Sequence, residues 1–135
     1  SQTALALGAV GYALKPADRE TLVETVQRIE AQTQRSVRRL LVVEDDPALR
    51  ESLVALLQLE GVEIVAVGTA KETLDRLAST SIDCVVLDLN LPDASGFEVL
   101  DAMSADQQHA FPPVIIYTGR ALSVDDEERL RRYSR

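Results

Sequence analysis

The sequence is poor in residues that carry disulfide, thiol or imidazole chemistry. Its 135 residues include one cysteine, one histidine and no tryptophan. The lone Cys84 excludes an internal disulfide, and its place in an apolar run indicates a small core hydrophobe. The only histidine, His109, lies in a polar loop, so we do not expect it to carry a transferable group. The only lysines are Lys15 and Lys71, so a function that needs a lysine must use one of these two.

The sequence also lacks a signal peptide and any apolar run long enough to cross a membrane. Its net charge of -8 argues against broad binding to nucleic-acid phosphates. The sequence is rich in aliphatic residues: 46% of the residues are hydrophobic and only 4% are aromatic. A chain of this length forms about one domain, and such aliphatic runs suit strands that are buried on both faces of a parallel sheet.

Strand-like and helix-like segments alternate along the whole chain, which predicts an α/β fold with a parallel sheet. Asp46 before Pro47 indicates a helix start, and Ser95 with Glu98 has the spacing of a capping box. We expect helices to begin near residues 18, 46, 69, 95 and 123. The expected strands are residues 9–14, 39–43, 62–67, 83–88 and 114–117.

Polar side chains follow three of the expected strands. Glu44 and Asp45 follow the strand 39–43, Asp88 ends the strand 83–88, and Thr118 follows the strand 114–117. The carboxyl ends of parallel strands meet at one edge of a sheet, so these groups are expected to converge there. Three clustered carboxylates repel unless a hard cation neutralises them, which predicts a magnesium site. Asp88 is then a candidate nucleophile for an aspartyl phosphate, and Thr118 could hydrogen-bond a phosphoryl group there.

Three motifs together resemble the receiver domain of two-component response regulators. The resemblance covers residues 38–135 in the usual order and residues 4–33 as a displaced final strand and helix. It implies that Asp88 is the phosphoacceptor, that Glu44 and Asp45 form the acidic pair, and that the Asn90 backbone carbonyl is a metal ligand. The motifs are Leu-Val-Val-Glu-Asp-Asp at 41–46, Cys-Val-Val-Leu-Asp-Leu-Asn-Leu-Pro-Asp at 84–93 and Val-Ile-Ile-Tyr-Thr-Gly at 114–119.

The same resemblance assigns the remaining site residues. Thr118 matches the switch hydroxyl after the fourth strand, and Lys15, followed by Pro16, matches the active-site lysine. Tyr12, three residues before Lys15, matches the aromatic that changes rotamer on activation. Thr118 and Tyr12 each have a purely structural alternative: Thr118 could belong to a simple turn, and Tyr12 could cover the sheet edge.

The resemblance implies a cytoplasmic phosphorylated switch and not an enzyme that acts on a separate substrate. The domain would at most phosphorylate itself from small donors and remove its own phosphate. The implied cofactor is Mg²⁺ or Mn²⁺. The implied partners are a histidine kinase or histidine phosphotransfer domain and a downstream protein or output domain, with no direct contact to nucleic acid or membrane.

The alternative function is a receiver-like interaction module with an incomplete, non-phosphorylated site. A flavin- or nucleotide-binding domain is disfavoured, because the first strand–helix turn has Glu-Asp-Asp-Pro where glycines would cradle phosphate.

The order of the segments departs from the family, whose lysine-bearing strand comes last. We expect residues 1–33 to be the last strand and helix of an upstream receiver, 34–37 a linker, and 38–135 a receiver that lacks its own last strand and helix. The expected fold is three-layered and flavodoxin-like, with a five-stranded parallel sheet in the order 2-1-3-4-5. Residues 1–33 would supply its fifth strand and helix and bring Lys15 near Asp88. The second expectation is a domain-swapped dimer instead of a monomer, and the third is a disordered N-terminal stretch.

Overall fold

The computed structural model describes residues 4–7, 10–106, 108 and 111–133. From β2 onward, strands and helices alternate along these residues, as the sequence predicts. The strands are β1 (Ala4–Leu7), β2 (Val10–Leu14), β3 (Arg39–Val43), β4 (Glu63–Val67), β5 (Cys84–Leu87) and β6 (Val114–Thr118). The helices are α1 (Arg19–Thr33), α2 (Pro47–Leu56), α3 (Ala70–Ser79), α4 (Gly96–Ala105) and α5 (Val124–Arg132).

The strands form one sheet in the order β1-β2-β6-β5-β3-β4. From β2 to β4 every neighbouring pair is parallel. Read from the β4 edge, this is the predicted order 2-1-3-4-5, with the N-terminal β2 in the fifth position. β2 pairs with β6 from Val10 opposite Val114 to Leu14 opposite Thr118. The fold class predicted from the sequence is therefore confirmed, including the displaced final strand.

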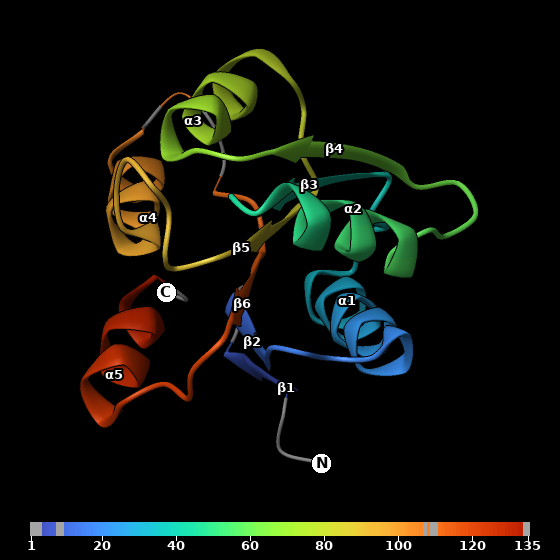
Figure 1. Ribbon diagram of the computed structural model, residues 1–135, viewed down its shortest axis with the longest axis horizontal. Helices are drawn as coiled ribbons and strands as arrows, with labels where there is room; N and C mark the ends of the chain where they lie inside the picture. The colour runs from blue at the N-terminus through green and yellow to red at the C-terminus, as the bar shows by residue number, and fades with distance from the viewer. Residues whose placement is uncertain (1–3, 8–9, 107, 109–110, 134–135) are drawn as a thin grey trace.

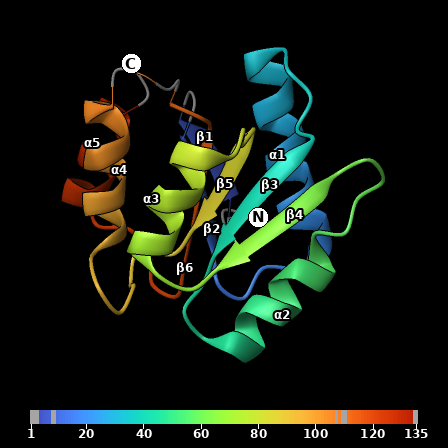
Figure 2. The ribbon, with the colours of Figure 1, turned by 90° about the horizontal axis from the view of Figure 1, so that it is seen from above.

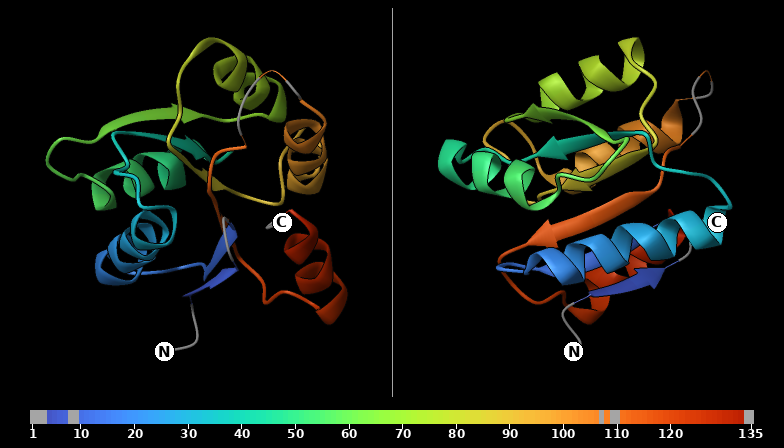
Figure 3. Two further views of the ribbon diagram at one scale, coloured as in Figure 1. Left: turned by 180° about the vertical axis from the view of Figure 1, so that it is seen from behind. Right: turned by 90° about the vertical axis from the view of Figure 1, so that its right-hand side faces the viewer.

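β1 is an addition that the sequence analysis did not predict. It pairs antiparallel with β2, from Ala4 opposite Ala13 to Leu7 opposite Val10, and its direction opposite to that of β6 is visible in Figure 3. The sheet therefore has six strands, of which five are parallel, and β1 covers the edge of β2 that would otherwise be open.

Helices cover both faces of the sheet, as Figures 1 and 2 show. α1 and α2 lie on one face, and α3, α4 and α5 lie on the other. Each face has its own hydrophobic core. Leu22, Val26 and Ile29 of α1 are fully or almost fully buried in the α1/α2-side core, so the N-terminal helix belongs to the same packed domain as the rest of the chain.

Polar caps set where the helices begin. Asp46 accepts hydrogen bonds from the backbone N–H groups of Ala48 and Leu49 at the start of α2. Ser95 and Glu98 form the predicted capping box at the start of α4. Among the described residues, no helix is long and apolar enough to cross a membrane.

Candidate functional site

Five side chains gather at the carboxyl edge of the parallel strands. Glu44 and Asp45 follow β3 directly, Asp88 follows β5, Thr118 ends β6 and Lys15 follows β2. Because β2, β6, β5 and β3 are adjacent and parallel, their ends place these residues at one edge of the sheet. The structure thus brings together, from four strands, residues that lie up to 103 positions apart in the sequence (118 minus 15).

The acidic residues form a cluster with the donor set of a hard divalent cation. One carboxylate oxygen from each of Glu44, Asp45 and Asp88 lies within 4.8 Å of the others. Glu44 and Asp88 are buried, at 2% and 5% exposure, whereas Asp45 is exposed. Magnesium prefers oxygen ligands and keeps several waters, so a cluster that is closed on one side and open to solvent at Asp45 fits this ion.

The ammonium group of Lys15 lies between two of these carboxylates. It donates to Asp88 Oδ2 at 2.9 Å and also pairs with Glu44 Oε1. Burial lowers the pKa of Lys15, but the hydrogen bonds that Lys15 donates to Glu44 and Asp88, together with the attraction of these two charges, outweigh burial, so the pKa stands above its usual range. Burial raises the pKa of Glu44, and the hydrogen bond from Lys15 opposes this only in part. The other lysine, Lys71, pairs with Asp75 on the surface of α3.

Hydrogen bonds fix both carboxylate oxygens of Asp88. Oδ1 accepts from the backbone N–H of Asn90 at 3.0 Å, while Oδ2 accepts from Lys15. A Cβ on Gly96 would lie 2.8 Å from the backbone oxygen of Asp88 and 2.8 Å from Leu89 Cα. A side chain larger than hydrogen at Gly96 would therefore displace the loop that orients Asp88. The metal role of the Asn90 carbonyl stays a prediction.

Thr118 carries a buried hydroxyl that has no hydrogen-bond partner among the described residues. The residue is 0% exposed, and a buried polar group without a partner destabilises the folded state. The role of this hydroxyl toward a phosphoryl group stays a prediction. Tyr12 lies in the core on the α3/α4/α5 side, where burial raises its pKa. His109, expected in a polar loop, lies outside the described residues.

Two residues that support the site were not singled out in the sequence. Arg50 of α2 donates to the backbone oxygen of Glu44 at 2.8 Å, and it was unremarkable as one of many surface-type charges. Asp93 accepts from the backbone N–H groups of Ala70 and Lys71 at 2.8 and 3.0 Å. It thereby ties the loop after Asp88 to the start of α3 and has a lowered pKa. The position of Asp93 at the end of the Leu-Pro-Asp motif was the sequence feature that could have indicated its role.

Comparison with known proteins agrees with this geometry. The family described as "response regulator receiver domain" matches residues 40–133. The chain belongs to the response regulator receiver family. The match begins after β2 and α1, so the segment that carries Lys15 lies outside it. The residues that carry this receiver's acidic cluster and Thr118 lie inside it.

Curated relatives include a sensor kinase and several response regulators. One is the CAI-1 autoinducer sensor kinase/phosphatase CqsS of Vibrio cholerae, 31% identical over 103 residues, which are 76% of this receiver chain and 15% of that protein. Another is the DNA-binding response regulator MtrA of Mycolicibacterium smegmatis, 34% identical over 87 residues, which are 64% of this chain and 37% of that protein. The chain thus spans well under half the length of these relatives.

Solved receiver structures have the same fold. The N-terminal domain of a response regulator receiver protein from Methanoculleus marisnigri superposes with a TM-score of 0.66 at 26% identity, covering 72% of this chain and 79% of that one. The signal receiver domain of a Luxo repressor protein described as putative, from Vibrio parahaemolyticus, gives 0.64 at 31% identity, covering 72% of each chain.

Proposed function

We propose that this receiver domain is a phosphoacceptor in two-component signal transduction and that Asp88 is the residue phosphorylated. The observation that carries the proposal is the position of Lys15, whose ammonium group contacts Asp88 and Glu44 beside the acidic cluster. The donor would be a phosphohistidine of a histidine kinase or a histidine phosphotransfer domain. Glu44, Asp45, Asp88 and the backbone carbonyl of Asn90 would hold Mg²⁺ or Mn²⁺.

The proposed reaction is a transfer of a phosphoryl group from nitrogen to oxygen. An Asp88 carboxylate oxygen attacks phosphorus, the O–P bond forms as the N–P bond breaks, and the imidazole leaves with the electron pair. When bound, the metal ion neutralises charge on the phosphoryl oxygens. Lys15 supplies a second positive charge to the same oxygens, and it is already desolvated and oriented by its two carboxylate partners.

Phosphorylation would switch a surface of the protein. The hydroxyl of Thr118 lacks a partner in the described part of the chain, so it is available to donate to a phosphoryl oxygen. Movement of Thr118, together with a change at Tyr12, would alter the face formed by β6, β2 and α5, which binds a downstream protein or output domain. We propose no direct contact to nucleic acid or membrane, and no catalysis on a separate substrate beyond self-phosphorylation from small donors and self-dephosphorylation.

The domain organisation is part of the proposal. Residues 1–33 would derive from the end of an upstream receiver, residues 34–37 would be a linker, and residues 38–135 would be the second receiver. The family match to residues 40–133 supports this division. The tandem receivers would work in the cytoplasm, where the kinase domains that phosphorylate such switches act.

An interaction module that is never phosphorylated is the alternative function. It is favoured by the origin of Lys15 in a segment outside the family match. A loss of that segment from the sheet would remove the cation that pairs with the carboxylates of Glu44 and Asp88. Intact mass after treatment with acetyl phosphate, with and without magnesium, separates the two functions. A magnesium-dependent phosphoryl adduct that is absent in Asp88→Asn supports the phosphoacceptor. Folded protein without an adduct refutes it and leaves the interaction module.

A further inference from the structure

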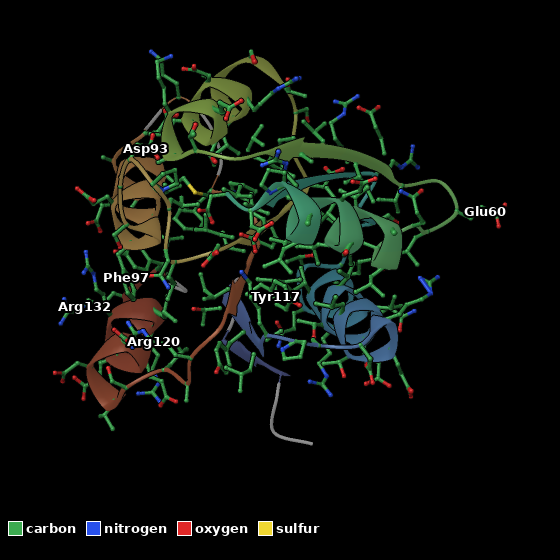
Figure 4. The ribbon with its side chains drawn as sticks, viewed as in Figure 1. Glu60, Asp93, Phe97, Tyr117, Arg120 and Arg132 are labelled. Atoms are coloured by element: carbon green, nitrogen blue, oxygen red, sulfur yellow. The ribbon has the colours of Figure 1, made fainter. Side chains whose placement is uncertain are left out.

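Tyr117 is the one aromatic residue in β6, where it follows three aliphatic residues. It lies next to Thr118 in β6 and pairs in register with Ala13 of β2. Its side chain packs in the α1/α2-side core and is 8% exposed. Figure 4 shows it beside β6, on the side of the sheet that α1 covers.

The hydroxyl of Tyr117 holds the turn that follows Lys15. It accepts a hydrogen bond from the backbone N–H of Ala17 at 3.3 Å. Ala17 is buried, and Pro16 before it has no N–H to donate, so Tyr117 supplies the acceptor that this turn needs. On the other side of the turn, the backbone N–H of Lys15 donates to the Thr118 carbonyl at 2.7 Å. Both ends of the turn are thus attached to β6.

The ring of Tyr117 also contacts the lysine side chain. The Lys15 ammonium lies 5.4 Å from the ring centroid, within the range of about 6 Å in which an aromatic face attracts a cation. The ammonium therefore has the ring on one side and the Glu44 and Asp88 carboxylates as its hydrogen-bond partners. An aliphatic residue could fill the same core volume, but it could neither accept from Ala17 nor attract the ammonium.

We propose that Tyr117 is a positioning residue that holds Lys15 in the phosphoacceptor site. It acts through the backbone of the turn and through the ammonium group, and it touches neither metal nor phosphoryl group. The effect of Tyr117 on phosphorylation rests on the proposed function of Asp88. The effect of Tyr117 on the position of Lys15 is independent of that function and can be measured separately. In this chain β2 comes from the opposite end of the sequence, and its covalent connection to the receiver runs through α1 and residues 34–37. Contacts with β6, such as those of Tyr117, must therefore fix the position of Lys15.

Lysine-selective isotope labelling tests the placement directly by NMR, because the chain has only Lys15 and Lys71. The ring current of Tyr117 should separate the side-chain signals of Lys15 from those of Lys71, which is exposed on α3. In Tyr117→Phe the separation should remain, since the ring is retained. In Tyr117→Leu the Lys15 signals should move toward those of Lys71. Unchanged Lys15 signals in a folded Tyr117→Leu variant would overturn the placement.

Hydrogen exchange gives a second readout that does not depend on the leucine variant folding. Tyr117→Phe removes only one oxygen, and the Ala17 amide should lose its acceptor and exchange several-fold faster. Amides in the centre of β6, such as Ile115, serve as the internal control and should keep their protection. An Ala17 amide that exchanges at the same rate in both proteins would contradict the role of the hydroxyl.

The rate of Asp88 phosphorylation tests the functional consequence. We expect about threefold slowing in Tyr117→Phe and about tenfold in Tyr117→Leu, the size of a lost hydrogen bond alone and of that bond together with a cation–aromatic contact. In a Lys15→Ala background, Tyr117→Leu should add no further slowing, because Tyr117 acts through Lys15.

Val26→Ala is the control variant: it removes volume from the same core without touching the turn, and it should leave the phosphorylation rate unchanged. Equal slowing by Val26→Ala, or full additivity with Lys15→Ala, would show a merely structural role. A wild-type chain without any adduct would refute the proposed function alone, and the NMR and exchange results would still decide the placement.

Discussion

Replacing Thr118 by valine should stabilise the unphosphorylated protein. The two side chains have nearly the same shape, and the residue is 0% exposed, so the change removes a buried hydroxyl without opening a cavity. A buried polar group without a partner destabilises a fold by about 1–3 kcal/mol, and the Thr118 hydroxyl has none in the described part of the structure. We therefore expect the free energy of unfolding to rise by about 1–2 kcal/mol. For 135 residues this corresponds to a Tm increase of about 4–7 °C.

Thermal and urea unfolding of the magnesium-free proteins measure this effect. Thr118→Ser is the matched control: it keeps the hydroxyl and loses one methyl group, so it should be destabilised by about 1 kcal/mol. The expected order of stability is valine above threonine above serine. A Thr118→Val protein that is no more stable than wild type would refute the reasoning, because it would mean that the hydroxyl is satisfied in the folded state and not free for an incoming group.

Three further predictions concern the lysine, the glycine and the acidic loop. Lys15→Met should slow magnesium-dependent phosphorylation at least tenfold by mass spectrometry, whereas Lys71→Met, on the surface of α3, should not. Gly96→Ala should lower the free energy of unfolding in urea by about 1–3 kcal/mol, since its Cβ would lie 2.8 Å from backbone atoms, whereas Gly119→Ala meets nothing within 4 Å and should be neutral. Asp93 has a lowered pKa because the backbone N–H groups of Ala70 and Lys71 donate to its carboxylate. Its stabilising effect is therefore present above about pH 3.9 and is lost as the pH falls through the lowered folded value. The Tm difference between wild type and Asp93→Asn should shrink as the pH falls below about 3.9, and a difference that stays constant throughout the acid range would contradict this.

Much of the site could be predicted because parallel strands impose a simple geometry. Glu44, Asp45, Asp88 and Thr118 each follow or end an aliphatic strand, so their convergence follows from the fold class alone. Tyr117 could not be assigned in this way, because its contacts with Ala17 and Lys15 depend on which segment lies beside β6. β1 also escaped prediction: Ala4–Leu7 has no alternating pattern and consists of good helix formers, and its strand state follows from pairing with β2.

The sequence by itself determined the alternation of strands and helices, the helix caps and the polar residues at the strand ends, since these depend on local patterns of side chains. It also assigned the active-site lysine to Lys15, one of only two lysines in the chain. The sequence left three possible arrangements for residues 1–33, and the tertiary structure has the first of them: β2 pairs with β6 in the same chain, and the Lys15 ammonium contacts Asp88 across a separation of 73 residues. The tertiary structure alone showed that the Thr118 hydroxyl is buried without a described partner. The physical reason is that strand pairing and the burial of a polar group depend on which residues surround them in the fold, and those residues are distant in the chain.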